Sequence, residues 1–253
     1  MPRGARKLSA SGIYHVMVRG INRQDVFLDT EDVKHYLHAL EKIKKDTNFS
    51  LYAYCFMSNH VHLLIKEGAI PLSLLMRRLG SSYVFWYNRK YDRIGYLFQD
   101  RYKSEGVEDD SYFLTVLRYI HQNPIKARLT KRIEAYPWSS YPGYLSGKDF
   151  TDREVSLAMF NSDRKKAKKE FIDYHRLIND DHCLEVDEKQ LLSDQEAEKI
   201  ITKLCHIKQC SDLPNLSKVL VIEYLRRLKE INHLSVRQIG RLTGIDRNTI
   251  QRA

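Results

Sequence analysis

The chain has 253 residues, of which 43% are hydrophobic and 29% are charged, so its composition is that of an ordinary soluble globular protein. No apolar run approaches the ~20 residues that cross a bilayer, and no signal-peptide segment follows the basic start, so we expect a cytoplasmic protein without membrane contact. The four scattered cysteines do not form a disulfide framework. The formal net charge of +10 favours a polyanionic partner, nucleic acid above all, although a basic soluble protein without such a partner is the alternative.

The first third of the chain predicts three strands and a helix. β-Branched and aromatic residues over 13–19 indicate a strand, and apolar residues at helical spacing indicate a helix that begins after Thr30. Residues 49–57 and 60–66 indicate two further strands. Only two residues separate this second pair, so we expect an antiparallel hairpin.

The next elements complete a recognisable order. A helical pattern covers 72–91, a loop and a fourth strand fill 95–107, and a helix begins at Asp110 or Ser111 and is limited by Pro124. The order β-α-β-β-α-β-α is the split βαβ pattern with one extra helix. We therefore expect an α+β, ferredoxin-like fold, whose antiparallel sheet carries helices on one face and leaves the other face for a site.

Composition changes after the tyrosine-rich segment that ends near residue 145. We expect a first domain over 1–145, a basic helical linker region over 146–195 and a helical domain over 196–253, so that the C-terminal part is all-α.

The last stretch has the spacing of a helix-turn-helix. Ser235 caps a first helix, Gly244 makes the turn, and Asp246 caps a second helix with polar and basic early residues. The side chains expected to contact DNA here are Arg237, Arg247 and Asn248. A basic helical hairpin without a DNA role is the alternative.

Two histidines of the third strand form a candidate metal site. Residues two apart on a strand point to the same face, so His60 and His62 lie side by side while Val61 and Leu63 face the core. Two imidazoles at that spacing can hold one metal ion and leave positions for substrate oxygens. Two histidines on a half-exposed face is the alternative.

A tyrosine on the last helix of the first domain can join them. Tyr119 and Asn123 lie four residues apart, so a phenol and an amide oxygen can reach the same point. A phenol is a poor nucleophile at neutral pH, but a metal-polarised phosphate or a nearby base makes its attack feasible. The alternative is a core tyrosine, which is the usual role of the sixteen tyrosines in this chain.

Together these motifs resemble the HUH single-strand DNA transposases, in particular the REP-associated tyrosine transposases. The resemblance covers residues 8 to about 145, and the basic tail with its helix-turn-helix is similar to an accessory domain of some members. It rests on five motifs that follow one another along the chain in the order found in the family. They are Arg19 to Arg23, His60-Val61-His62, Gly95 to Lys103, Tyr119 to Pro124, and Tyr136 to Tyr141.

The resemblance implies roles in catalysis for four residues of the histidine and tyrosine motifs. His60, His62 and Asn123 would bind a divalent metal, Mg²⁺ or Mn²⁺ in this family although imidazole favours zinc. Tyr119 would attack a phosphodiester of single-stranded DNA, giving a 5′-phosphotyrosine link and a free 3′-hydroxyl that can later reverse the step.

The resemblance also implies the partner, a DNA hairpin or palindromic repeat with an adjacent single strand, bound by a monomer or a homodimer. Tyr102 or Trp138 could stack on bases, and the expected phosphate contacts near the site are Arg19, Arg23, Arg101 and Lys103.

Two other functions fit the same residues. One is a domesticated DNA-binding regulator that uses the C-terminal helix-turn-helix and does not cleave DNA. The other is a metal-dependent nuclease that activates water in place of Tyr119.

Overall fold

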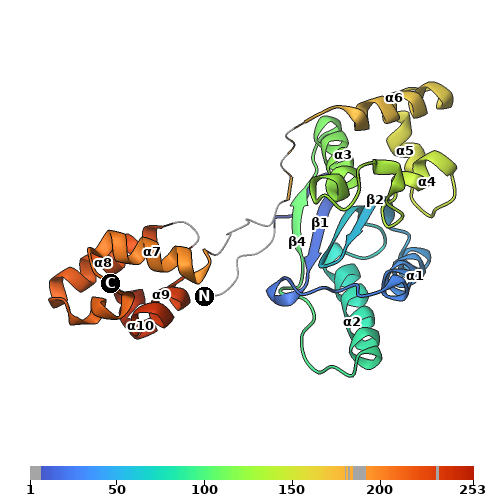
Figure 1. The fold of residues 1–253 in the computed structure, drawn as a ribbon. Coiled ribbons are helices and arrows are strands. Elements are labelled where there is room, and N and C mark those ends of the chain that lie inside the picture. The colour runs from blue at the N-terminus through green and yellow to red at the C-terminus, as the bar shows by residue number, and fades with distance from the viewer. Residues whose placement is uncertain (1–6, 180, 182, 185–191, 232–233) are drawn as a thin grey trace. The chain divides into compact units, whose positions relative to one another are not determined.

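The computed structural model divides the chain into two compact units, residues 1–184 and 185–253, which are described separately (Figure 1). The structure describes residues 7–179, 181, 183–184, 192–231 and 234–253. Among these residues, no helix is long and apolar enough to cross a membrane.

The first unit is built on a four-stranded antiparallel sheet. Its strands lie in the order β2-β3-β1-β4 and are β1 (Ile13–Arg19), β2 (Ser50–Met57), β3 (His60–Lys66) and β4 (Lys103–Gly106). The two-residue turn between β2 and β3 forms the expected hairpin, and β1 then separates β3 from β4. This order confirms the α+β, ferredoxin-like prediction.

Helices α1 (Thr30–Thr47) and α2 (Leu72–Lys90) pack on one face of the sheet. Alternate strand residues, such as Val16 and Leu63, are fully buried against them. The N-cap of α1 is Asp29 rather than the expected Thr30. The carboxylate of Asp29 accepts amide hydrogens of the first turn, and the carboxylate of Asp32 accepts the amide hydrogen of Asp29.

The opposite face is covered as well, which corrects the expectation of helices on one face only. Helix α3 (Asp110–Lys126) packs on β2 and β3 there, with Cys55, Leu64 and Ile120 fully buried between them. The register of β2 shifts between Leu51 and Ala53. The side chain of Tyr52, which lies at this shift, packs in the second core on the side of α3.

Helix α3 also runs past the proline that was expected to limit it. Pro124 occupies the last turn, and the amide of Ala127 still donates to the carbonyl of Asn123 at 2.9 Å. One missing backbone donor near a helix end is tolerated, so the helix gains Ile125 and Lys126.

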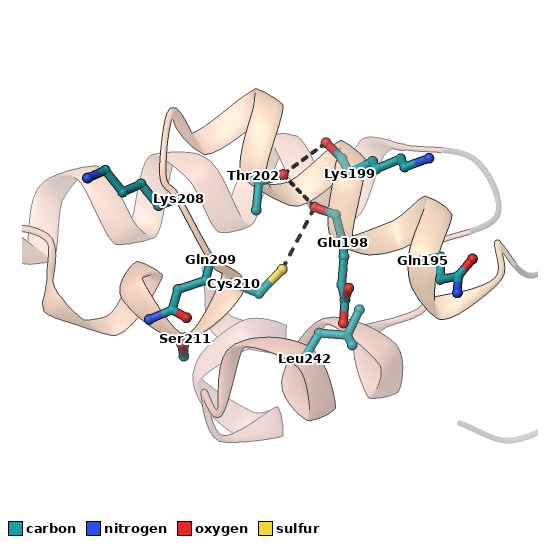
Figure 2. A pocket seen from close by; sticks show the side chains of 9 residues that line it. All are labelled: Gln195, Glu198, Lys199, Thr202, Lys208, Gln209, Cys210, Ser211 and Leu242. Carbon is teal, nitrogen blue, oxygen red and sulfur yellow. Dashed lines mark hydrogen bonds between the residues drawn. The ribbon is translucent and has the colours of Figure 1, made fainter.

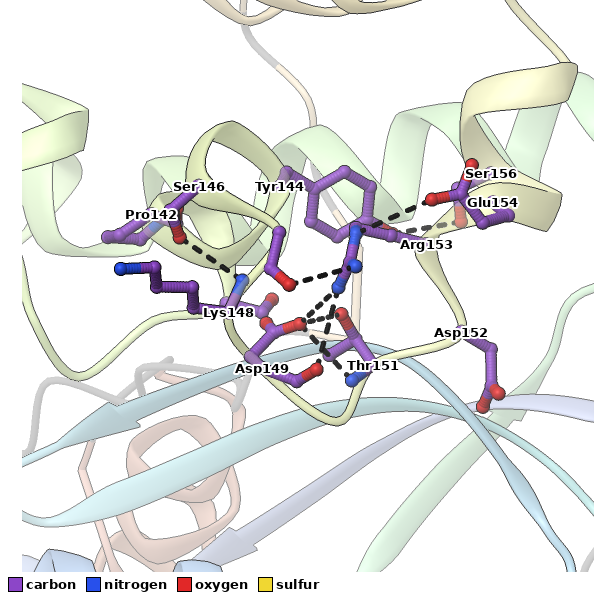
Figure 3. Close-up of polar contacts among 12 residues, drawn as sticks. Pro142, Tyr144, Ser146, Lys148, Asp149, Thr151, Asp152, Arg153, Glu154 and Ser156 are labelled. Carbon is purple, nitrogen blue, oxygen red and sulfur yellow. Dashed lines mark hydrogen bonds and ion pairs between the residues drawn. The ribbon is translucent and has the colours of Figure 1, made fainter. Parts of the chain in front are cut away.

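Three further helices belong to the first unit, so its boundary lies later than the expected residue 145. They are α4 (Tyr141–Ser146), α5 (Arg153–Ala158) and α6 (Arg164–Arg176), and they add side chains to the core beneath α3. Figure 3 shows how the turn between α4 and α5 is closed: Arg153 donates to Asp149 Oδ1 at 2.9 Å and to the Gly147 carbonyl at 3.0 Å.

A chain of buried side chains ties α3 to α6 and to β2. His121 Nδ1 lies 2.9 Å from His175 Nε2, and His121 Nε2 lies 2.7 Å from Ser140 Oγ. Ser140 Oγ in turn accepts the amide hydrogen of Tyr54 at 3.0 Å. All of these polar atoms are satisfied inside the core, which fixes where α3 lies on the sheet.

The second unit is all-helical, as expected for the C-terminal part. Its elements are α7 (Asp194–Cys205), the 3₁₀ helix η3 (Cys210–Asn215), α8 (Lys218–Glu230), α9 (Val236–Thr243) and α10 (Arg247–Arg252). Leu225, Leu228, Ile239 and Ile250 are fully buried at its centre. The four cysteines of the whole chain are free thiols, so the prediction of no disulfide framework is confirmed.

Candidate active site

The two histidines of β3 lie side by side on the face of the sheet that α3 covers. Their ring centroids are 5.1 Å apart, and His62 is buried while His60 is half-buried. His60 Nδ1 lies 2.6 Å from Asn59 Oδ1, and His62 Nδ1 lies 2.9 Å from His15 Nε2. Each imidazole therefore uses its Nδ1 for a protein contact that fixes the ring.

Helix α3 brings Tyr119 to the same place within one chain. Its ring centroid lies 5.7 Å from that of His62 at an interplanar angle of 80°, an edge-on contact, and 5.8 Å from that of His15. The side chain is 6% exposed. Asp109 caps the helix by accepting the Tyr112 amide hydrogen at 2.8 Å, which sets where α3 begins. The helix and the strand thus bring the two sequence motifs together.

Asn123 completes the cluster one turn beyond Tyr119. It is buried, and its side-chain amide interacts with His60, where it offsets part of the lowering of the pKa of that imidazole. The structure therefore groups His60, His62, Tyr119 and Asn123 as the sequence spacing predicts.

The donor set of this cluster fits a weakly held divalent cation. Burial lowers the pKa of His60 to about 4 and that of His62 well below its ordinary value of 6.5, so both imidazoles are neutral and able to donate a lone pair. Asn123 would add a neutral amide oxygen. Among the described residues, no three His, Cys, Asp or Glu side chains are grouped to hold a metal ion, so any metal here depends on this mixed set of two imidazoles and one amide.

Comparison with known proteins finds a family similar to this region. Residues 9–123 match the family model described as "Transposase IS200 like". This part of the chain is similar to the IS200-like transposases.

Two relatives and one solved structure show the same similarity. The chain is 23% identical to the REP-associated tyrosine transposase of Escherichia coli K12 over 51% of its own length and 76% of the relative. It is also 23% identical to a putative REP-associated tyrosine transposase of Haemophilus influenzae, over 54% and 83%. A solved REP-associated tyrosine transposase bound to a REP hairpin aligns with a TM-score of 0.50 at 19% identity, covering 59% of this chain and 88% of that one, and shows the shared fold.

Two side chains at the centre of this cluster were missed from the sequence. His15 lies on β1 next to β3, on the same face as His62 because Met17, two residues on, is the register partner of His62. Lys126 lies in the turn that α3 gains beyond Pro124, with its Nζ 4.9 Å from the centroid of the Tyr119 ring. An H-x-H motif shows neither, because strand register and helix end are set by tertiary packing.

The basic residues near the site that were expected to contact DNA differ in their exposure to solvent. Arg19 is half-buried, is paired in register with His60, and its charge also lowers the pKa of His60. Arg23, Arg101 and Lys103 are exposed. They remain candidate phosphate contacts.

The two aromatic residues expected to stack on bases are less available. Tyr102 is 7% exposed and belongs to the core under α1 and α2, so little of its side chain is open to a base. Trp138 is half-buried against the same core.

The second unit contains an open hollow of about 540 Å³ (Figure 2). Its lining is polar and carries both signs of charge, with Lys199 and Lys208 opposed by Glu198, and it includes the Cys210 thiol. It offers no cluster of the kind formed by the histidines and Tyr119, so we assign it no role in the transposase chemistry.

The buried histidines predict that acid weakens the first unit. Burial lowers the pKa of His15 and His175 to about 3 and that of His121 well below 6.5, as it does for His60 and His62. In the unfolded chain these groups take up protons near pH 6.5, whereas the folded protein does not. The free energy of unfolding should therefore fall as pH falls below about 6.5, by up to about 1.4 kcal/mol per pH unit for each histidine.

Tryptophan fluorescence measures this effect in the intact chain, because both tryptophans, Trp86 and Trp138, lie in the first unit. Urea unfolding curves at pH 7 and pH 5 should differ clearly in midpoint. His38→Gln, a change at an exposed histidine, should leave the pH dependence unchanged. Equal midpoints at the two pH values would contradict the prediction.

Proposed function

We propose that the first unit cleaves and rejoins single-stranded DNA through a covalent phosphotyrosine intermediate, with Tyr119 as the nucleophile. The observation that carries the proposal is the contact of the Tyr119 ring with His62 in the same chain, next to a second histidine and an amide. A tyrosine that only fills the core would not require two histidines and an amide beside its ring.

In the proposed reaction the Tyr119 oxygen attacks the phosphorus of a phosphodiester, and the proton of its hydroxyl passes to solvent water. The bond from phosphorus to the 3′-oxygen breaks, and the released 3′-oxygen takes up a proton. The 5′-phosphate then remains attached to Tyr119. Attack on this phosphotyrosine by a 3′-hydroxyl releases the tyrosine and joins the strands, so no external energy source is needed.

The residues around Tyr119 have separate roles in this proposal. His60, His62 and Asn123 would hold a divalent cation, Mg²⁺ or Mn²⁺, which when bound polarises the scissile phosphate and offsets its developing charge. The Lys126 ammonium lies over the Tyr119 ring, where its positive charge favours the phenolate that forms during attack. Arg19, Arg23, Arg101 and Lys103 would contact the DNA backbone.

The substrate we propose is a DNA hairpin with an adjacent single strand, by analogy with the REP hairpin in the solved relative. The test is incubation of the protein with end-labelled hairpin DNA and Mn²⁺, followed by a denaturing gel. A slow-migrating covalent adduct is the expected result. Cleavage without an adduct would mean that water is the nucleophile, and binding without cleavage would favour a DNA-binding regulator.

We further propose that α9 and α10 of the second unit bind duplex DNA. Ser235 Oγ accepts the Gln238 amide hydrogen at 3.1 Å, and Asp246 accepts two amide hydrogens at the start of α10. Between the helices Gly244 has a φ of +76°, which favours glycine. These contacts support the helix-turn-helix interpretation, in which the exposed side chains of Arg237, Arg247 and Asn248 face the major groove.

This second proposal predicts a sequence-selective loss of binding. With duplexes selected by the full-length protein from a random pool, Arg247→Ala should weaken binding by about 1–3 kcal/mol, or about 5- to 150-fold. The matched control is Arg226→Ala on α8, an exposed arginine of the same unit that is outside the helix pair. Fluorescence anisotropy measures both, and equal losses for the two variants would show only non-specific charge.

A further inference from the structure

His15 and His62 form a buried, hydrogen-bonded pair of imidazoles inside the first unit. His15 is fully buried and His62 is 2% exposed, and one nitrogen of each ring meets the other, His15 Nε2 to His62 Nδ1 at 2.9 Å. Their ring centroids are 5.1 Å apart. A nitrogen–nitrogen contact of this length is a hydrogen bond, so one of the two nitrogens carries the proton and the other accepts it.

The direction of that hydrogen bond decides what His62 can do. If His15 donates, Nδ1 of His62 is the acceptor, its Nε2 carries the ring proton, and no lone pair remains for a cation. If His62 donates from Nδ1, its Nε2 is unprotonated and can bind a metal. The identity of the donor thus separates a binding-competent ring from an incompetent one.

The surroundings of His15 hold it as a neutral ring with one contact. Its other nitrogen, Nδ1, is buried and has no hydrogen-bond partner among the described residues. The nearest candidate carboxylate by register is Glu105 on β4, but this side chain is exposed. Within the part of the chain that the structure describes, the hydrogen bond of the His15 ring is therefore the one with His62.

We propose that His15 is a positioning residue whose Nε2 accepts the Nδ1 proton of His62, and so fixes His62 in the tautomer with a free Nε2 lone pair. The inference rests on the metal site proposed above and adds the residue that makes it selective for one tautomer. Metal-ligating histidines commonly use the second ring nitrogen to donate to a protein acceptor, which is usually a carboxylate or carbonyl. Here the acceptor is a third imidazole.

Two substitutions separate this role from simple packing. His15→Phe fills the space of the ring but removes the acceptor, whereas His15→Gln keeps a polar group that reaches about as far as Nε2. The affinity for Mn²⁺ should fall by about 10- to 100-fold in His15→Phe and by no more than about threefold in His15→Gln. Met17→Leu, beside the same site on β1, should change neither affinity nor tautomer and controls for repacking.

The readouts are Mn²⁺ binding, from the electron paramagnetic resonance signal of the free ion, and the tautomer of His62, from ¹⁵N NMR of the metal-free protein. Peaks of His62 are identified by their loss in His62→Ala. In the wild type we expect a protonated Nδ1 and a bare Nε2, and in His15→Phe a mixture or the opposite tautomer. Thermal unfolding of His15→Phe should stay near that of the wild type, because one unpartnered buried nitrogen replaces another.

The outcomes distinguish this inference from the proposed function. A wild-type His62 with its proton on Nε2 would overturn the role of His15, as would equal losses of Mn²⁺ affinity in His15→Phe and His15→Gln. A wild-type protein that binds no Mn²⁺ but shows the expected tautomer, lost in His15→Phe, would remove the metal from the proposed function and leave the effect of His15 on His62 established.

Discussion

Tyr119→Phe should abolish the covalent protein–DNA adduct and all strand joining, because the substitution removes the one oxygen that the proposed reaction attaches to phosphorus. The phenyl ring keeps the contact with His62, so the fold and DNA binding should not change. The measurement is a denaturing gel with labelled hairpin DNA, together with a binding assay that shows that the variant still takes up the substrate.

The matched control is Tyr112→Phe on the same helix. Tyr112 lies about two turns before Tyr119, and its hydroxyl interacts with Glu105 and Cys183, which helps to raise its pKa. It should retain adduct formation. If Tyr119→Phe cleaves the DNA as well as the wild type, the nucleophile is water and the phosphotyrosine mechanism is wrong.

His62→Ala should lower the rate of cleavage by about 10²- to 10³-fold at a saturating DNA concentration. Loss of one ligand weakens the cation that polarises the phosphate, and an effect of about 3–4 kcal/mol on the barrier corresponds to that range. Single-turnover cleavage measured over a series of Mn²⁺ concentrations checks it, and partial recovery at high Mn²⁺ is part of the expected result.

His35→Gln is the control for loss of an imidazole elsewhere in the same unit. His35 lies on α1 and stacks on Trp86 with ring centroids 4.0 Å apart, in the helical layer on the other face of the sheet. Its cleavage rate should equal that of the wild type. An unchanged rate in His62→Ala would mean that the pair on β3 does not support catalysis.

Much of the site follows from local sequence patterns. Alternation along a strand places His60 and His62 on one face whatever the strand pairs with, and helical spacing does the same for Tyr119 and Asn123. The bounds of β3 agree with the prediction, because the turn at Ser58 and Asn59 limits the strand at one end. These features depend on residues close in the chain.

The features that were missed depend on residues far apart in the chain. No local pattern shows that β1 pairs with β3 in the register that sets Met17 opposite His62, and this register is what brings His15 to the site. The register shift in β2 that turns Tyr52 toward α3 is likewise a property of the paired sheet. A helix that continues through Pro124 and a buried Tyr102 are further results of packing that overrides local preference.

The proposed activities of the two units complement each other. The first unit would act on an unpaired strand, in which Tyr119 must reach a phosphodiester. Helices α9 and α10 would instead bind a duplex through side chains in its major groove. A chain with both would join a cleaving domain to a second DNA-binding domain. The regulator hypothesis keeps only duplex binding by the second unit, so it predicts that substitutions at Tyr119 leave every DNA-dependent activity of the protein unchanged.

The central claim, that Tyr119 itself becomes linked to DNA, is tested most directly by mass spectrometry of the trapped adduct. Trypsin cleaves after Arg118 and Lys126, so Tyr119 falls in the peptide of residues 119–126, which contains no other tyrosine, serine or threonine. After nuclease treatment, our account predicts a nucleotide 5′-phosphate on this peptide, assigned to Tyr119 by fragmentation. A nucleotide on any other residue, or cleaved DNA with no modified peptide, would contradict it.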